Sequence, residues 1–258
     1  MEILYVVTFN KRLFEKSGID LIKSFVDNNI ISKLLVCYEG FNFSHKSEKV
    51  IGYNLEKDQY MNLWMKNNID IIPDIYGGNA KDNNPIFLKD KKKGQPWARY
   101  RSAGYFRKVV ALNHAIDTYS NKFDIICVID CDCIFKTFIP NDIFDKVFND
   151  GTQMFFYWSD YRKKINRGPE TGFTGYCKKN GGYEFAKIIC KSFITQDFLR
   201  FEYWDDGFVI GQLIKENNDK FKLKDIVRNT KKCTTRVMDI EDNIFFNYVK
   251  HFKNKHDY

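Results

Sequence analysis

Five consecutive apolar residues, Ile125–Ile129, are followed at once by the acidic pair in Asp130-Cys131-Asp132. A run without a polar residue does not suit a strand that has one face in water, so it predicts a strand buried on both faces of a parallel sheet. Parallel strands are usually connected by helices that cover the sheet. We therefore expect an α/β fold, a single domain with a mostly parallel central sheet flanked by helices.

Segments typical of strands and of helices alternate along most of the chain. Strands are predicted at Ile3–Thr8, Leu34–Tyr38, Ile69–Ile72, Asp124–Ile129, Gln153–Trp158 and Leu223–Val227. Helices are predicted at Ser17–Asn29 (with Ser17 as N-cap), Asp58–Asn68, from Ser102 to near Asn121, Asn141–Phe148, Gly182–Phe193 and Asp206–Glu216. Loops are expected at Pro73–Trp97 and Arg162–Gly175, and a helix or ordered tail at Glu241–Lys253.

Composition excludes several classes of protein. With 44% hydrophobic and 17% aromatic residues among 258, the chain can bury a core, which excludes disorder. The longest apolar runs are far shorter than a membrane span, and the N-terminus lacks the pattern of a secretory signal. The seven cysteines form no CxxC pair and are expected to be free thiols in a reducing compartment. We therefore expect a cytoplasmic protein without a transmembrane segment.

The net charge of +8 is compatible with nucleic acid, an anionic membrane surface or an anionic small substrate. No nucleic-acid motif accompanies the charge, so we expect no nucleic-acid partner. Arg99, Arg101 and Arg107 fall within nine positions, and the planar guanidinium group suits phosphate better than an ammonium group does. The charge pattern therefore favours a phosphate-bearing small molecule.

The carboxylates of Asp130 and Asp132 are two residues apart and would point to the same side of an extended chain. They follow the carboxyl end of a buried strand, where ligands bind in open α/β sheets. Two like charges so close repel unless a cation offsets them, and oxygen ligands favour Mg²⁺, Mn²⁺ or Ca²⁺ over Zn²⁺. In an extended chain Cys131 and Cys133 would point the other way. The alternative is an ordinary acidic turn at a strand end.

This order of elements resembles the glycosyltransferases of the GT-A fold, the nucleotide-diphospho-sugar transferases. The specific motif is Asp130–Asp132; the N-terminal strand, the basic segment and the helix beginning near Lys108 supply the context. The resemblance implies a metal-dependent glycosyltransferase of the hexosyltransferase type, with Mn²⁺ or Mg²⁺ on the donor diphosphate. It also implies a nucleotide-binding half, 1–132, and an acceptor-binding half, 133–258, that ends in a metal and phosphate segment.

By the same resemblance, several residues are expected to contact the nucleotide-sugar donor, of the UDP or GDP type. These are Thr8, Phe9 and Asn10 at the end of the first strand, Glu39 after the second, Arg101 and Lys108 before the metal strand, Asp130, and Lys255. For the first-strand residues the alternative is a simple strand-to-helix turn. For Arg101 and Lys108 it is a solvated helix start.

The acceptor, a glycan or another hydroxyl compound, is expected beside Glu170, Thr171, Gly172 and Trp204, with Trp158 and Tyr161 as further aromatic candidates. Asp205 or Asp206 resembles the general base of inverting members, although Asp205 could simply be a helix N-cap.

A C-terminal histidine completes the metal site in many members of the family. His251 fits that position, with His256 as competitor, and a mixed carboxylate and imidazole shell favours Mn²⁺ over Mg²⁺. The glycine and the Pro-Trp of the best-known version of this segment are absent.

Three other functions remain open from the sequence. A phosphatase-like hydrolase also uses a DxD pair, but normally after its first strand. A sugar-phosphate nucleotidyltransferase has a related sheet, but normally carries a glycine-rich loop where this chain has Thr8-Phe9-Asn10-Lys11-Arg12. A non-catalytic glycan-binding module would suit the basic charge.

Overall fold

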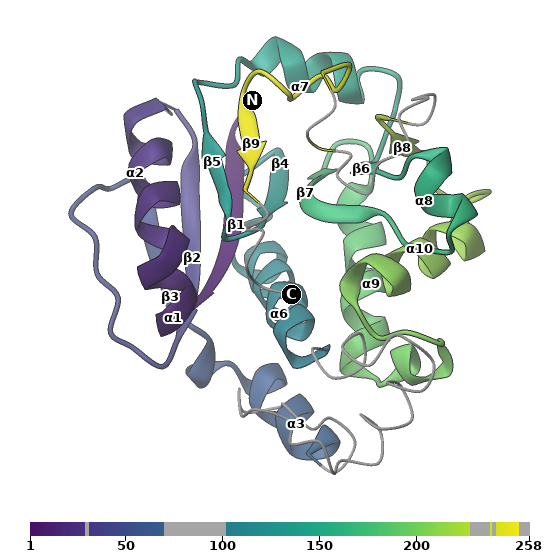
Figure 1. The fold of residues 1–258 in the computed structure, drawn as a ribbon, viewed down its shortest axis with the longest axis horizontal. Coiled ribbons are helices and arrows are strands. Elements are labelled where there is room, and N and C mark those ends of the chain that lie inside the picture. Colours follow the sequence, from purple (N-terminus) through teal and green to yellow (C-terminus); the bar gives the residue numbers. More distant parts are fainter. Residues whose placement is uncertain (29–30, 70–101, 228–237, 239–240, 253–258) are drawn as a thin grey trace.

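A seven-stranded sheet runs through the molecule in the order β3-β2-β1-β4-β7-β6-β8 (Figure 1). The computed structural model describes residues 1–28, 31–69, 102–227, 238 and 241–252. The strands are β1 (Ile3–Asn10), β2 (Lys33–Glu39), β3 (Val50–Asn54), β4 (Ile125–Ile129), β6 (Met154–Tyr157), β7 (Glu170–Cys177) and β8 (Leu223–Asp225). Since β3, β2, β1 and β4 are mutually parallel, the predicted α/β fold with a mostly parallel sheet is confirmed.

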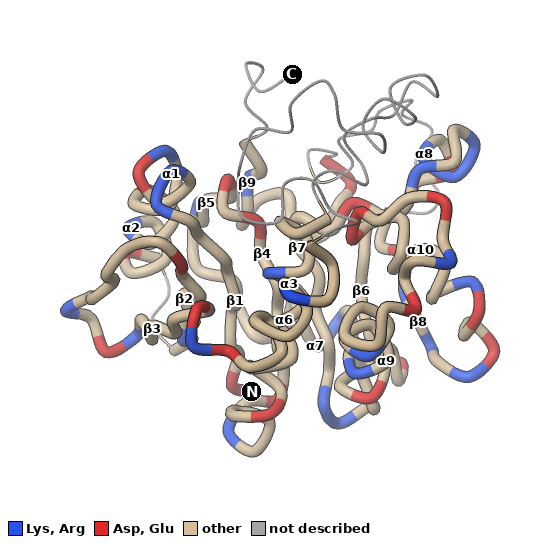
Figure 2. The backbone as a smooth tube through the Cα atoms, turned by 90° about the horizontal axis from the view of Figure 1, so that it is seen from below, with Lys and Arg blue, Asp and Glu red and all other residues tan. Residues whose placement is uncertain are grey.

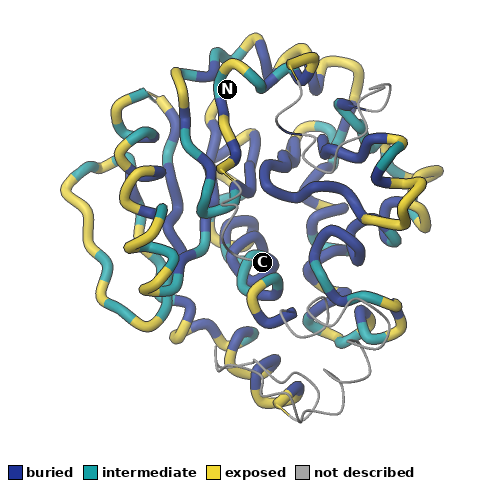
Figure 3. Tube along the Cα trace, in the orientation of Figure 1, coloured by how far each residue is buried: buried dark blue, intermediate teal, exposed yellow. Residues whose placement is uncertain are grey.

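Alternate residues of β1 pack into two different cores, one on each face of the sheet. Leu4 and Val6 contact the core that includes α6 (Ser102–Tyr119), whereas Tyr5 and Val7 contact the core that includes α2 (Ile19–Asn28). Both faces are therefore covered, and Figure 3 shows the central strands as buried. This explains why the strands read as continuous apolar runs rather than as alternating patterns.

The remaining helices cover the same two faces. Helices α3 (Gln59–Asn68), α9 (Gly182–Ile194) and α10 (Asp206–Asn217) contribute to the core on the α6 side, and α7 (Asn141–Phe148) to the core on the α2 side. All five long helices expected from position 58 onward lie within a few residues of their predicted bounds. No helix in the described parts of the chain is long and apolar enough to cross a membrane.

The second half of the sheet differs most from expectation. The loop predicted at Arg162–Gly175 is wrong: α8 (Asp160–Lys164) occupies its start, and β7 pairs antiparallel with both β4 and β6. All eight residues of β7 are buried. Its glycines admit large neighbours, since a Cβ on Gly175 would lie 2.2 Å from the Phe155 ring. The glycines that suggested a loop therefore reflect close packing inside a strand.

The chain after β1 enters helix earlier than predicted. Asn10 caps α1 (Lys11–Leu13) by accepting from Leu13 N at 2.8 Å, and a π-helical turn, Phe14–Gly18, continues into α2. Ser17 lies inside this turn, where its hydroxyl donates to Leu13 O, so its prediction as N-cap is wrong. Strand β3 was not predicted. The strand expected at Ile69–Ile72, except for residue 69, and the loop at Pro73–Trp97 lie outside the described residues.

A small second sheet brings the C-terminal segment to the end of β4. Strand β5 (Cys133–Phe135) pairs antiparallel with β9 (Val249–His251), and the register places Cys133 opposite His251. The described part of the predicted Glu241–Lys253 helix or tail, 241–252, is ordered and consists of turns followed by β9, so the tail is the correct alternative. This pairing joins residues over a hundred positions apart.

Candidate functional site

The Asp130–Asp132 segment is a turn tied to the neighbouring strand. Asp130 N donates to Gly172 O at 2.8 Å, and Cys133 N donates back to Asp130 O at 3.1 Å. Because the chain turns here, the expectation that Cys133 points away from the aspartates is wrong. Its Sγ lies with ligand atoms of Asp132 and His251 in one group, all within 4.8 Å. Figure 2 shows acidic positions gathered at the same ends of β4 and β9.

His251 faces both aspartates. Its Nε2 atom lies 2.9 Å from Asp132 Oδ1 and 3.5 Å from Asp130 Oδ2, and its side chain is 2% exposed. The strand holding it is fastened locally, because Phe252 N donates to Asp132 O at 2.8 Å. The structure therefore brings together the three residues that the sequence proposed as metal ligands.

These three side chains fit a divalent cation. His251 Nε2 is buried and makes no well-aligned hydrogen bond among the described residues, although two carboxylate oxygens lie close to it. Oxygen and imidazole donors of this kind suit Mn²⁺ or Mg²⁺. Burial, followed by the charges of Asp130 and Asp132, raises the pKa of the Cys133 thiol well above its ordinary value, and its Sγ donates to Gly172 O. As a neutral thiol, Cys133 is a poor ligand for these hard cations.

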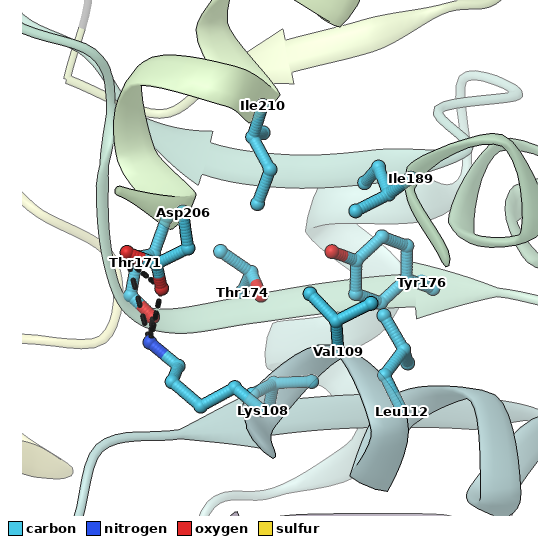
Figure 4. Close-up of a pocket in the computed structure, with 10 residues that line it drawn as sticks. Lys108, Val109, Leu112, Thr171, Thr174, Tyr176, Ile189, Asp206 and Ile210 are labelled. Atoms are coloured by element: carbon cyan, nitrogen blue, oxygen red, sulfur yellow. Dashed lines mark hydrogen bonds and ion pairs between the residues drawn. The ribbon is translucent and has the colours of Figure 1, made fainter. Parts of the chain in front are cut away.

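A buried lysine connects this group to the start of α10. Lys108 Nζ, on α6, lies 2.7 Å from Asp130 Oδ1 and 2.6 Å from Asp206 Oδ2, and 3.3 Å from the Thr171 carbonyl and hydroxyl oxygens. Figure 4 shows Lys108 reaching toward Thr171 and Asp206. Burial acts to lower the pKa of Lys108, but the charges of Asp130 and Asp206 outweigh it and raise that pKa above its ordinary value. Lys108 is therefore a fixed cation beside the candidate metal ligands.

The wall behind Lys108 is apolar. A narrow cavity there is lined on its inner side by Val109, Leu112, Val128, Tyr176, Ile189 and Ile210 (Figure 4). Thr171, Lys108 and Asp206 form its polar end. Ion pairs are stronger in surroundings of low dielectric, so this wall holds Lys108 and Asp206 together more tightly than water would.

The two candidate bases occupy different environments. Asp205 Oδ1 accepts from Phe208 N at 2.9 Å, so Asp205 is the N-cap of α10. Burial and then the neighbouring charge of Asp206 raise the pKa of Asp205 from 3.8 to about 6. Asp206 is 5% exposed, and its Oδ2 accepts from the Thr171 hydroxyl at 2.8 Å as well as from Lys108. Asp206 thus belongs to the charged network, whereas Asp205 also stabilises the helix start.

Glu170 lies behind His251 rather than in a loop. Its Oε1 is 3.3 Å from His251 Nδ1, and its Oε2 accepts from Met238 N at 3.2 Å. Burial acts to lower the pKa of His251, but interactions with Asp132, Glu170 and Asp130 raise it to about 9. No sequence pattern indicated the contact between Glu170 and His251, because it depends on the pairing of β5 with β9.

The residues expected to bind the nucleotide lie at the carboxyl ends of β1 and β2. Asn10 is opposite Glu39 in the strand register. Thr8 is half-buried, whereas Phe9 is 1% exposed and packs against Phe14. Glu39 Oε1 lies 2.5 Å from Arg107 Nε, an ion pair that the sequence did not predict. Arg101, Lys255 and His256 lie outside the described residues.

The aromatic residues expected near an acceptor are mostly part of the core. Trp204 is 6% exposed, packs edge-on against Phe198, and donates from Nε1 to Phe201 O. Trp158 is 5% exposed and donates from Nε1 to Arg167 O at 2.7 Å, whereas Tyr161 is half-buried. Little ring surface of either tryptophan is left for a sugar to stack on.

No family model and no curated protein matches this sequence. Among solved structures, the chain is similar to mouse xyloside xylosyltransferase 1 in its apo form. The sequence identity is 11%, the match covers 87% of this chain and 85% of that chain, and the TM-score is 0.49. The side chains at the end of β4 are therefore the evidence from which a function can be argued.

Proposed function

We propose that this chain is a metal-dependent glycosyltransferase. It would transfer a sugar from a nucleoside-diphosphate sugar, of the UDP or GDP type, to the hydroxyl group of a glycan or another acceptor. The observation that carries the proposal is the group formed by Asp130, Asp132 and His251, with Lys108 beside it. Such a group of acidic, imidazole and fixed cationic side chains suits a doubly charged cation and a diphosphate together.

In this proposal, Asp130, Asp132 and His251 hold Mn²⁺ or Mg²⁺. The bound cation would supply positive charge against the negative charge that develops on the departing diphosphate. Lys108 adds a cation that the protein itself holds in place, since two carboxylates and Thr171 fix its position. A positive charge that is already oriented needs no reorganisation during the reaction. Arg101 and Lys255 are proposed as further phosphate contacts.

Asp206 or Asp205 would accept the proton of the acceptor hydroxyl. Asp206 is ion-paired with Lys108 at 2.6 Å, and the same ammonium group contacts the proposed metal ligand Asp130. Asp205 has the raised pKa, about 6, that brings a carboxylate closer to the proton-transfer range at neutral pH. An inverting transfer would use one of them as general base.

The donor's nucleoside is proposed to lie over Thr8, Phe9, Asn10 and Glu39. These residues stand at the carboxyl ends of the adjacent strands β1 and β2, next to β4, where open α/β sheets bind ligands. The ion pair between Glu39 and Arg107 would hold both side chains beside the proposed nucleoside position. The acceptor is proposed to lie on the β7 side, near Thr171 and Gly172. Glu170 and Trp204, which are buried, would form the layer beneath these two residues.

A transfer assay with a panel of nucleoside-diphosphate sugars and Mn²⁺ tests the proposal. We expect Asp132→Ala to lose at least about 100-fold in transfer or donor hydrolysis, because a ligand of the charge-neutralising cation is gone. Asp142→Asn is the control, since Asp142 is exposed on α7 and pairs only with Lys146 among the contacts described. Unchanged activity in Asp132→Ala would contradict the proposal. Release of inorganic phosphate from a phosphomonoester would favour a phosphatase, and release of pyrophosphate from a nucleoside triphosphate with a sugar phosphate would favour a nucleotidyltransferase.

A further inference from the structure

We propose that Glu170 is a positioning residue for the metal ligand His251. By accepting a hydrogen bond from the Nδ1–H of the imidazole, Glu170 keeps the Nε2 lone pair directed at the site between Asp130 and Asp132. This inference rests on the proposed function, because it requires that His251 bind the cation.

The geometry of the pair supports this role. Glu170 Oε1 lies 3.3 Å from His251 Nδ1, and both side chains are 2% exposed. On the other side of the same ring, Nε2 faces Asp132 Oδ1 at 2.9 Å and Asp130 Oδ2 at 3.5 Å. One nitrogen of the imidazole, Nδ1, thus faces the buried carboxylate of Glu170, and the other, Nε2, faces the carboxylates of Asp130 and Asp132.

Glu170 is itself held in place. It is the first residue of β7, opposite Tyr157 in the register with β6, and its Oε2 accepts from Met238 N at 3.2 Å. A strand residue with one carboxylate oxygen fixed by a backbone amide has little freedom to turn away from His251. The other oxygen is therefore available to the imidazole in one orientation.

Gly172, two residues along the same strand, leaves space for the ring. A Cβ at Gly172 would lie 2.7 Å from His251 Cε1 and 2.9 Å from His251 Nδ1. Residues two apart in a strand share a face, so Glu170 and Gly172 lie on the same side of β7. The carboxylate of Glu170 orients the His251 ring, and the missing side chain of Gly172 leaves space for that ring. Two features of β7 thus serve the same imidazole.

The chemistry requires such a partner. A neutral imidazole carries one proton, and only the nitrogen without it can bind a metal ion. A carboxylate on the far nitrogen fixes this tautomer and the ring orientation and makes the ligating nitrogen more basic. Removing such a partner weakens metal binding by about 10- to 100-fold in proteins generally.

The test is a Mn²⁺ titration followed by electron paramagnetic resonance, without any donor or acceptor. We expect Glu170→Gln to weaken Mn²⁺ binding by about 10- to 100-fold. An amide has one oxygen, so it cannot place an acceptor at both the Oε1 position that faces His251 Nδ1 and the Oε2 position that faces Met238 N. We also expect the ¹⁴N modulation of a bound imidazole, present in the pulsed spectrum of the wild-type complex, to fall in the variant. A loss of stability alone does not remove that signal.

Asp58→Asn is the matched control. Asp58 is likewise a buried carboxylate, 6% exposed, that accepts from a backbone amide, Met61 N, and from the Tyr53 hydroxyl, but it lies at the start of α3. We expect it to lower stability without changing Mn²⁺ affinity or the nitrogen signal. Equal affinity and an equal nitrogen signal in Glu170→Gln and wild type would overturn the inference and leave the proposed function standing. Failure of the wild type to bind Mn²⁺ would overturn both.

Should Glu170→Gln fail to fold, the wild-type protein provides a second measurement. With ¹⁵N-labelled histidine and Mg²⁺, the His251 ring is expected to carry its proton on Nδ1. A proton on Nε2 in the Mg²⁺-bound protein would overturn the inference.

Discussion

Lys108 Nζ lies 2.6 Å from Asp206 Oδ2 and 2.7 Å from Asp130 Oδ1, so a single ammonium group joins helix α6 to two acidic segments. Asp130 is also a proposed metal ligand. The lysine and a divalent cation therefore share one carboxylate, through different oxygen atoms: Oδ1 faces the lysine, and Oδ2 faces His251.

We predict that Lys108→Met lowers the free energy of unfolding by about 3 kcal/mol, because it leaves the buried carboxylate of Asp206 without its counter-charge. We also predict that Mn²⁺ binds this variant at least as tightly as the wild type, since Asp130 is no longer shared. Urea unfolding with and without Mn²⁺ measures both effects.

Lys187→Met is the control for this variant. Lys187 forms an ion pair with Asp117 in which both side chains are about half exposed, so its loss should cost less than about 1 kcal/mol and leave metal binding unchanged. If Lys108→Met were no less stable than this control, or bound Mn²⁺ more weakly than the wild type, the assignment of Lys108 would be wrong.

Asp205 gives a prediction about stability and pH. Burial and the charge of Asp206 raise its pKa in the folded protein from 3.8 to about 6, so the ionised form destabilises the fold above pH 6. Asp205→Asn keeps an N-cap acceptor and removes that charge. We expect the variant to be more stable than the wild type at pH 7.5, by at most about 3 kcal/mol.

The gain should shrink as the pH falls from 6 toward 4, because wild-type Asp205 then becomes protonated. Chemical unfolding of both proteins at several pH values measures it. A difference that stays constant between pH 4 and 8, or a less stable variant at pH 7.5, would contradict the environment described for Asp205.

Local sequence patterns predicted the parallel half of the sheet well. Runs such as Ile125–Ile129 are apolar because both faces of the sheet are covered, and the long helix α6 carries an apolar face toward it. The acidic pair was recognisable as a candidate ligand site because its position after a buried strand is itself a local feature. His251 was found as a candidate only through the family resemblance.

Features that depend on distant segments could not be predicted. Strand β7 reads as a loop because Gly172 and Gly175 are required by the His251 and Phe155 rings, which approach from other parts of the chain. Cys133 was expected to point away from the aspartates, but the hydrogen bond from Cys133 N to Asp130 O closes a turn that no residue pattern indicated. The contact of Glu170 with His251 needs β9 beside β5.

Two glycines with opposite surroundings give a paired prediction. A methyl group at Gly172 would lie 2.8 Å from Met238 Sδ and 2.7 Å from His251 Cε1. We expect Gly172→Ala to lower the free energy of unfolding by about 1–3 kcal/mol and to weaken Mn²⁺ binding, because the ring must shift. Gly104 lies in α6, and outside the helix's own backbone no atom of the described residues lies within 4 Å of an added Cβ, so Gly104→Ala should stabilise by about 0.5–1 kcal/mol.

Thermal unfolding and Mn²⁺ titration of the two variants measure these effects. A Gly172→Ala protein with wild-type affinity and stability would show that the space beside His251 is not limiting.

The most direct test of the central claim is calorimetric titration with UDP, GDP, ADP and CDP, with and without Mn²⁺. The wild type is compared with Asp130→Asn/Asp132→Asn and with Asp142→Asn/Asp145→Asn, which removes the same charge from exposed positions of α7. We predict that one nucleotide binds only with Mn²⁺, that the first double variant loses this binding, and that the second keeps it. Binding that is absent throughout, or indifferent to Mn²⁺ and to Asp130 and Asp132, would contradict a metal-dependent donor site at the end of β4.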